Sequence, residues 1–247
     1  MLNKKTVLVT GANSGIGFAT VNHFLKLDYE VIAIDKNSHN LSELKNNKKF
    51  SLFIVDLSDE IQVNSLIEEL NTSFTYPDIL INAAGIREIT PVLDLSTQLF
   101  NKVINVNLVA PFILSRELCR AWIRQGKRGT IINIASVSGM MAEPERAAYV
   151  SSKHAIIGLT KQMAMEFGAK GIRINSISPG VIRTELTEEY FQDENLVSLI
   201  RNNHALHTWG EPEDIVSCIE FLSSEHSKFI TGSNFVIDGG WTAGKKL

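Results

Sequence analysis

Short runs of β-branched and aliphatic residues alternate along this chain with longer amphipathic stretches, and this alternation restricts the fold more than any other feature. A strand buried on both faces is a short apolar run, and a helix that covers such a sheet has one apolar side. Repetition of strand and helix is typical of a parallel sheet with helices on both faces. We therefore predict a doubly wound α/β domain with seven parallel strands at 6–10, 30–34, 50–55, 78–82, 129–135, 172–178 and 234–238. Helices are expected at about 15–27, 60–71, 97–125, 147–169 and 212–223.

Size and composition favour a single domain over residues 1–247. The chain is 44% hydrophobic and 21% charged, which is ordinary for a globular protein. A formal net charge of -3, with no long run of Lys or Arg, gives no reason to expect nucleic acid or an anionic membrane as a partner. The first apolar run, residues 6–10, is too short for a signal peptide, and no run approaches the length of a membrane span. Cys119 and Cys218 lack metal-ligand spacing and are expected to be free thiols, so the sequence predicts a cytoplasmic protein.

A glycine-rich turn joins the first strand to the first helix and predicts a dinucleotide site. It reads Thr10-Gly-Ala-Asn-Ser-Gly-Ile-Gly17. Glycines allow the backbone to approach a pyrophosphate, whose charge is favoured by the free N–H groups of a helix N-terminus. Asp35 ends the second strand, where a carboxylate can accept hydrogen bonds from the adenosine ribose. The same carboxylate would repel a 2′-phosphate, which favours NAD over NADP, and the neighbouring Lys36 would offset part of that repulsion.

Tyr149 and Lys153 are the strongest candidates for catalysis. Residues four apart on a helix project from one face, so the phenol and the ammonium would lie close together. A nearby cation favours the ionised phenol, whose pKa is ordinarily near 10, so we expect a lowered pKa and a usable base. Ser136 follows the apolar run 130–135, at the strand end where ligands of open α/β sheets collect.

Other candidate residues follow strands or interrupt a helix. Asp56 and Leu57 follow the third strand, and Asn82-Ala-Ala-Gly85 closes the fourth. Asn107 lies inside the long helical stretch, where asparagine is unfavourable unless its side chain has a specific partner. No metal site is predicted, because the histidines form no ligand set with one another; we assign no role to His23, His39, His154 or His226.

Together these motifs resemble the short-chain dehydrogenase/reductase family, and the resemblance covers almost the whole chain in the family's order. They comprise Thr10 to Gly17, Asp56, Asn82 to Gly85, Asn107, Ser136, Tyr149 with Lys153, and Pro179-Gly180 followed by Thr184. Ala83 departs from the pattern, since the family usually carries a second Asn there. The resemblance implies a Rossmann-type fold. It also implies a nicotinamide cofactor bound by Gly11, Asn13, Ser14, Gly15, Ile16, Gly17, Asp35, Lys36, Asp56, Leu57, Asn82, Ala83, Ala84, Gly85, Tyr149, Lys153, Pro179, Gly180, Ile182 and Thr184.

The family's chemistry implies a role for each catalytic candidate. Tyr149 would be the general acid/base while a hydride moves between the substrate carbon and the nicotinamide. Lys153 would lower the phenol pKa and hold the nicotinamide ribose, Ser136 would bind the substrate oxygen, and Asn107 would hold a water that relays protons. Residues 184–206 fall where the family keeps a mobile lid, which Tyr190, Phe191 and Leu196 would line. The acidic run Glu185 to Glu194 is interpreted as a solvated face.

The sequence therefore predicts an NAD-dependent dehydrogenase of a small secondary alcohol or ketone. A sugar, polyol or cyclic diol is favoured by the polar candidates Arg87, Glu143, Arg146 and His207. The alternatives are an NADPH-dependent 3-oxoacyl (acyl carrier protein) reductase and a non-catalytic nucleotide-binding regulator. The enoyl-reductase branch spaces its Tyr and Lys further apart, and the sugar-epimerase branch has a longer chain. Surplus apolar residues on 97–125, and the family's usual pairing of this helix with 147–169, predict a homotetramer or dimer.

Overall fold

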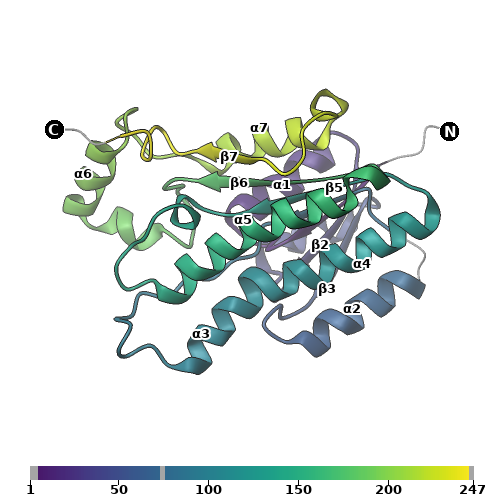
Figure 1. The fold of residues 1–247 in the computed structure, drawn as a ribbon, viewed down its shortest axis with the longest axis horizontal. Coiled ribbons are helices and arrows are strands. Elements are labelled where there is room, and N and C mark those ends of the chain that lie inside the picture. The colour runs from purple at the N-terminus through teal and green to yellow at the C-terminus, as the bar shows by residue number, and fades with distance from the viewer. Residues whose placement is uncertain (1–4, 73–75, 245–247) are drawn as a thin grey trace.

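The computed structural model describes residues 5–72 and 76–244. Its seven strands form one parallel sheet in the order β3-β2-β1-β4-β5-β6-β7 (Figure 1), which confirms the predicted doubly wound fold. The strands are β1 (Thr6–Thr10), β2 (Glu30–Asp35), β3 (Phe50–Ile54), β4 (Ile79–Asn82), β5 (Gly129–Ile134), β6 (Ile172–Pro179) and β7 (Asn234–Ile237). The α-helices are α1 (Gly15–Lys26), α2 (Glu60–Thr72), α3 (Thr97–Ile104), α4 (Ala110–Gln125), α5 (Ala147–Phe167), α6 (Glu194–Asn203) and α7 (Pro212–Ser223).

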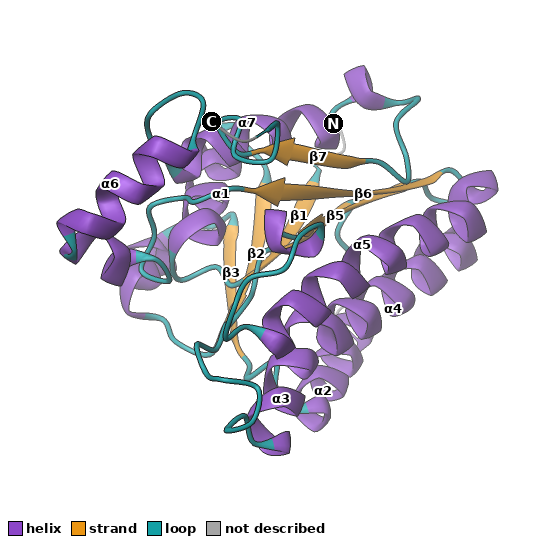
Figure 2. Cartoon of the chain, turned by 60° about the vertical axis from the view of Figure 1, so that its left-hand side comes forward, coloured by secondary structure: helices purple, strands orange, loops and turns teal. Residues whose placement is uncertain are grey.

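The helices cover both faces of the sheet because successive strand residues point to opposite sides. Leu8 of β1 packs in a core that includes α2, α4 and α5, whereas its neighbours Val7 and Val9 pack in a second core that includes α1 and α7. Figure 2 shows the helices from α2 to α5 stacked side by side on one face. Since β1 pairs with β2 on one side and with β4 on the other, the strand order reverses beside β1. Ligands of such sheets bind at the carboxyl ends of the strands at this reversal.

The helix predicted over 97–125 is divided by a wider turn. A π-helical turn, η2 (Asn105–Val109), lies between α3 and α4, and the helical path continues through it. Such turns contain one extra residue, and they occur often at functional sites. The asparagines that are unfavourable in a regular helix therefore lie where the regular hydrogen bonding changes.

Several helical segments were not predicted from the sequence. They include the 3-10 helix η1 (His39–Asn46), which follows β2, and α6 in the region expected to form a lid. Within the ranges that the structure describes, no helix has the length and apolar character needed to cross a membrane.

Candidate active site

A cavity of about 380 Å³ opens at the carboxyl ends of β1, β2, β3 and β4. Most residues predicted to bind the cofactor line it: Gly11, Asn13, Ser14, Gly15, Ile16, Gly17, Asp35, Lys36, Asp56, Leu57, Ala83, Ala84, Gly85 and Thr184. Its other lining residues include His39 from η1 and Lys102 from α3. No role was predicted for His39, because nothing in the local sequence pattern shows that η1 folds back over the glycine-rich turn.

The glycine-rich turn is packed too closely for side chains. Gly11 has a φ of 67°, and a Cβ there would lie 2.7 Å from the Cα of Ala84. A Cβ on Gly17 would lie only 2.0 Å from the carbonyl oxygen of Gly11. Ser14, at the N-cap of α1, makes no side-chain capping bond, so the first N–H groups of α1 remain for other acceptors. These features fit a backbone cradle for a pyrophosphate.

Asp35 holds the turn and faces the same cavity. Its carboxylate accepts hydrogen bonds from the backbone N–H groups of Asn13, at 3.0 Å, and Asn37, at 2.9 Å. The side chain of Asn13 also contacts a ring nitrogen of His39 at 3.2 Å. Each carboxylate oxygen has a second lone pair, so Asp35 can also accept from a ribose hydroxyl.

A second carboxylate, that of Asp56 just after β3, also lines this cavity. Hydrogen bonds from the backbone and side chain of Ser58 lower the pKa of Asp56, and Lys36 and Lys102 add to the lowering. This end of the cavity therefore contains carboxylates and cations together.

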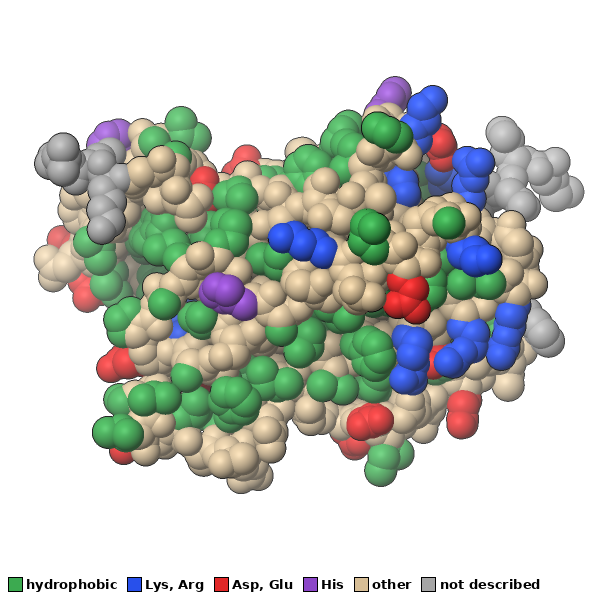
Figure 3. All heavy atoms as spheres, in the orientation of Figure 1, with side chains coloured by type: hydrophobic (Ala, Val, Ile, Leu, Met, Phe, Trp, Pro, Cys, Tyr) green, Lys and Arg blue, Asp and Glu red, His purple; other side chains and the backbone are tan. Residues whose placement is uncertain are grey.

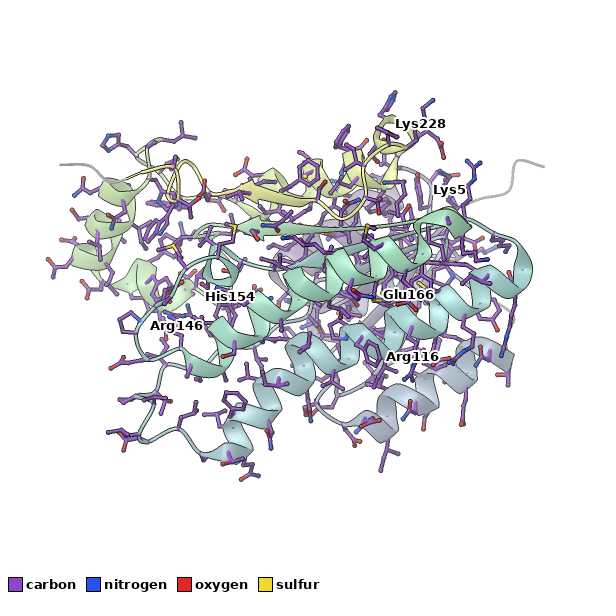
Figure 4. The ribbon with its side chains drawn as sticks, in the orientation of Figure 1. Lys5, Arg116, Arg146, His154, Glu166 and Lys228 are labelled. Carbon is purple, nitrogen blue, oxygen red and sulfur yellow. The ribbon has the colours of Figure 1, made fainter. Side chains whose placement is uncertain are left out.

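Tyr149 and Lys153 lie together on α5, as predicted. The Lys153 ammonium is 5.6 Å from the centroid of the Tyr149 ring and donates to the carbonyl of Ile134 at 2.8 Å. Only 4% of Lys153 is exposed, and this burial lowers its pKa to about 8. His154 projects from the outer side of the same helix (Figure 4), away from this pair.

The pKa of Tyr149 is raised from its ordinary value, and not lowered as predicted. Burial is the largest cause, because it penalises the phenolate. A hydrogen bond with Ser136 and the charges of Arg87 and Arg146 lower the pKa, while Glu143 raises it. The phenol therefore stays protonated near neutral pH unless a ligand brings additional positive charge.

Ser136 lies at the end of β5 and is buried. Its hydroxyl accepts from the backbone N–H of Ser138 and donates to the Ser138 hydroxyl, both at 3.1 Å. The Ser138 hydroxyl donates in turn to Glu143. This chain of bonds fixes the direction of the Ser136 oxygen beside Tyr149.

Asn107 fastens the loop after β4 to α5. Its amide nitrogen donates to the carbonyl of Ile86 at 2.9 Å and to the hydroxyl of Ser152 at 3.0 Å, while its oxygen accepts from the Ile86 N–H at 2.9 Å. A Cβ on Gly85 would lie 3.6 Å from both the Asn107 oxygen and the Lys153 ammonium. Asn107 thus lies near Lys153, while its direct partners are protein groups.

Some residues predicted to bind the cofactor do not line the cavity of about 380 Å³. Asn82 lies below it and donates to Asn133 at 2.8 Å and to Ser115 at 3.3 Å, because the end of β4 is covered by α4 and α5. Ile182 packs in the core beside α1 and α7. Pro179 is buried at the end of β6, and Gly180 lines a separate cavity beside Tyr149.

A second cavity, of about 250 Å³, adjoins Tyr149. It is lined by Ser136, Ser138, Tyr149, Gly180 and Trp241, by Arg87, Glu143 and Arg146, and by the lid residues Leu186, Thr187, Tyr190 and Leu196. The guanidinium groups of Arg87 and Arg146 both donate to the hydroxyl of Tyr190. Arg146 also pairs with Glu143 at 3.0 Å. Figure 4 shows Arg146 beside the N-terminal end of α5.

Two residues predicted to face the substrate lie elsewhere. Phe191 packs edge-to-face on Trp209 with 5.0 Å between ring centroids, and both line a separate pocket with His207. Tyr190 and Leu196 line the second cavity, beside Tyr149. The chain direction in η5 (Glu188–Gln192) turns the adjacent residues Tyr190 and Phe191 to different sides.

Glu88 is a positioning residue that the sequence did not indicate. It is 5% exposed, and its carboxylate accepts from the N–H of Ala148 at 2.7 Å and of Tyr149 at 3.2 Å. These N–H groups belong to the first turn of α5, where a carboxylate is favoured by the helix dipole. Glu88 therefore fixes the start of the helix that carries Tyr149 and Lys153.

Comparisons with known proteins agree with this geometry. A family model described as enoyl-(acyl carrier protein) reductase matches residues 11–242. The chain is 36% identical to a 3-oxoacyl-[acyl-carrier-protein] reductase of Rickettsia typhi over 238 residues, 96% of each chain. Among solved structures it is similar to a 4-hydroxyisoleucine dehydrogenase complexed with NADH, with 61% identity, a TM-score of 0.96, and coverage of 98% of this chain and 100% of the other. A complex of a 4-hydroxyisoleucine dehydrogenase with NADH and succinate matches at 59% identity and a TM-score of 0.92, over 96% of this chain and 100% of that one.

Proposed function

The chain belongs to the short-chain dehydrogenase/reductase family, and we propose that it transfers a hydride between NAD(H) and the secondary alcohol carbon of a small hydroxy acid. It is an NAD(P)-dependent oxidoreductase that acts on CH–OH groups. The finer assignment, to a hydroxylated amino acid similar to 4-hydroxyisoleucine, rests on the charges of the substrate cavity and on the 61% identity with the dehydrogenase of that name.

The pair of arginines beside Tyr149 is the observation that carries the proposal. The Arg87 and Arg146 side chains are only 9% and 12% exposed, yet both guanidinium groups reach the cavity wall. Guanidinium groups bind carboxylates by paired, charge-assisted hydrogen bonds. A cavity of about 250 Å³ is suited to a small substrate. These features support an anionic substrate over the neutral sugar, polyol or cyclic diol favoured by the sequence.

Glu143 gives the cavity a negative group that suits an amino acid. Its carboxylate lies between Ser138 and Arg146, on the same wall as the arginines. An ammonium and a carboxylate on one ligand would thus find opposite charges on one side of the cavity. The similar dehydrogenase that was solved in complex with NADH and succinate supports a small carboxylic acid as the ligand.

The side chains of this chain supply the proton chemistry. NAD⁺, when bound in the larger cavity, supplies the hydride acceptor and a positive charge. The Ser136 hydroxyl exchanges its bond to the Ser138 hydroxyl for one to the substrate oxygen, and Tyr149 removes the proton of the alcohol. Lys153, positive below a pKa of about 8, stabilises the phenolate that this transfer requires. Asp35 favours NAD, since it would repel a 2′-phosphate.

A 3-oxoacyl reductase that uses NADPH is the second candidate, and it is supported by the 36% identity with the Rickettsia enzyme. Lys36, His39 and Lys102 at the adenine end would favour a 2′-phosphate, in opposition to Asp35. Against this candidate, the lid that borders the substrate cavity carries Glu185, Glu188, Glu189, Asp193 and Glu194. Such a rim would repel the phosphate of an acyl carrier arm. A non-catalytic role is disfavoured because Ser136, Tyr149 and Lys153 are held together.

The test is NAD⁺ reduction, followed by absorbance, with 4-hydroxyisoleucine and with its methyl ester. The free acid should be turned over, and the ester should show a KM at least about tenfold higher, because it lacks the charge that the arginines bind. Arg87→Met should raise KM for the acid and leave that for the ester nearly unchanged. Equal turnover of acid and ester would refute the carboxylate subsite. Faster reduction of a 3-oxoacyl thioester with NADPH than oxidation of any hydroxy acid would establish the second candidate instead.

A further inference from the structure

Two carboxylates of one lid segment contact the groups that would bind the anionic parts of both ligands. Glu185 accepts a hydrogen bond from the N–H of Gly15, the first residue of α1, at 3.1 Å. Four residues later, a carboxylate oxygen of Glu189 lies 2.5 Å from the guanidinium of Arg87. We propose that residues 184–190 form an internal strap, in which Glu185 stands in for the cofactor pyrophosphate and Glu189 for the substrate carboxylate. Binding of each ligand then displaces its glutamate. The part that concerns Glu189 rests on the proposed function, whereas the part that concerns Glu185 rests only on the nucleotide cofactor.

Glu185 takes a position that suits a phosphate. The N-terminus of α1 offers N–H donors and the positive end of the helix dipole, and Ser14 does not cap it. The strap packs closely on this backbone, since a Cβ on Gly15 would lie 2.9 Å from a side-chain carbon of Thr184, and both Gly15 and Glu185 line the same cavity. A pyrophosphate bound there would need the N–H of Gly15 and would repel the Glu185 carboxylate at that distance.

Glu189 takes a position that suits the substrate carboxylate. The side chain of Arg87 is 9% exposed, so its guanidinium has little room to turn into solvent. The Glu189 side chain is 58% exposed, so it can turn into solvent when another carboxylate arrives. The ion pair therefore joins a fixed cation to an exchangeable anion.

The two glutamates are linked by a hydrogen-bonded turn. The hydroxyl of Thr187 accepts from the N–H of Thr184 at 3.0 Å and donates to the carbonyl of Ile182 at 2.5 Å. Leu186, on this turn, lines both cavities. Because the turn is short and internally hydrogen-bonded, displacement of either glutamate also moves the turn between them, which borders both ligand cavities.

Glu188 provides a matched control. It belongs to the same segment and carries the same charge, but it pairs with Arg183 at 3.7 Å and lines neither ligand cavity. Its replacement by glutamine changes the net charge of the lid by the same amount. Any effect specific to Glu185 or Glu189 must therefore come from their positions.

The experiment measures ligand binding by calorimetry in the parent protein and in the variants Glu185→Gln, Glu188→Gln and Glu189→Gln. NAD⁺ is titrated alone, and succinate is titrated into protein saturated with NADH. Glu185→Gln should tighten NAD⁺ binding about fivefold, and Glu189→Gln should tighten succinate binding about fivefold, which corresponds to about 1 kcal/mol each. Glu188→Gln should change both affinities less than twofold, about 0.4 kcal/mol.

Several results would overturn the strap. NAD⁺ affinity of Glu185→Gln equal to or weaker than that of Glu188→Gln would show that Glu185 does not compete with the cofactor. Weaker succinate binding by Glu189→Gln would show that the ion pair holds the lid over the substrate. If succinate binds neither the parent nor any variant, the proposed function fails, and the NAD⁺ titrations alone decide whether the strap exists.

Discussion

Replacing Lys153 with methionine should stabilise the ligand-free fold while it abolishes function. The ammonium is buried, and its pKa is lowered from 10.5 to about 8. Since one pKa unit corresponds to 1.36 kcal/mol, keeping Lys153 charged at pH 7 costs about 3 kcal/mol of folding free energy. Methionine has a similar length and no charge, and its loss of the hydrogen bond to Ile134 costs about 1 kcal/mol. The net gain of about 2 kcal/mol corresponds to a Tm about 4 to 8 °C higher for a chain of this size.

The pH dependence of this gain identifies its cause. The pKa of Lys153 in the folded protein lies below its pKa in the unfolded chain, so the destabilisation is fully present below pH 8. Between pH 8 and 10.5 the folded protein releases this proton while the unfolded chain retains it, and the stability of the parent rises. The advantage of Lys153→Met should therefore fall close to zero by about pH 10.

Thermal unfolding at pH 7 and at about pH 10, without cofactor, tests this reasoning. Lys161→Met is the control, because Lys161 is exposed on the same helix, and it should leave Tm nearly unchanged at both pH values. NAD⁺ should raise the Tm of the parent but have little effect on Lys153→Met. A Lys153→Met protein less stable than the parent at pH 7, or one with the same advantage at both pH values, would refute the argument.

Four other predictions concern catalysis, cofactor choice, positioning and assembly. Tyr149→Phe should lower turnover by about a hundredfold to ten-thousandfold and leave NAD⁺ affinity nearly intact. In the parent protein, the rate of alcohol oxidation should increase with pH through an apparent pKa well below 10. A Tyr149→Phe variant whose turnover is within about tenfold of the parent would rule out the acid/base role. Asp35→Ser should improve NADP turnover relative to NAD by about tenfold, and a parent protein that already prefers NADP tenfold would contradict this. Glu88→Leu should lower Tm and kcat together, because the first turn of α5 loses its carboxylate acceptor, whereas unchanged kcat would show that Glu88 does not position Tyr149. Light scattering should reveal a homotetramer, since α4 and α5 expose Phe112, Ile123 and Met165, and Figure 3 shows hydrophobic side chains on the face that these two helices form. A stable monomer at micromolar concentration would refute this prediction.

Features that depend on neighbours in the sequence were predictable. The alternation of strands and helices follows from local burial, and the glycine-rich turn and Asp35 lie next to the strands that position them. Tyr149 and Lys153 share a helix face because their spacing is one turn. The sequence therefore predicted the fold and most of the cofactor cavity.

Features that depend on distant segments were not predictable. Glu88 meets Tyr149 across 61 residues, Glu189 meets Arg87 across 102, and Glu185 meets Gly15 across 170. No local pattern indicates such pairs, so Glu88 was missed and the two lid glutamates were interpreted as solvated. The raised pKa of Tyr149 has the same origin, because burial depends on elements that pack over α5.

The π-helical turn at Asn105–Val109 sets the rotational phase between α3 and α4. An α-helical residue advances by 100°, so removing a single residue from this turn would rotate one helix by that angle relative to the other. Asn107 would then lose its hydrogen bonds to Ile86 and Ser152, or the apolar face of α4 would no longer pack against the sheet. The length of this segment therefore carries structural information that its composition does not. Substitutions that preserve hydrophobicity should be tolerated here more readily than any deletion, and alignments of related chains should place gaps outside it.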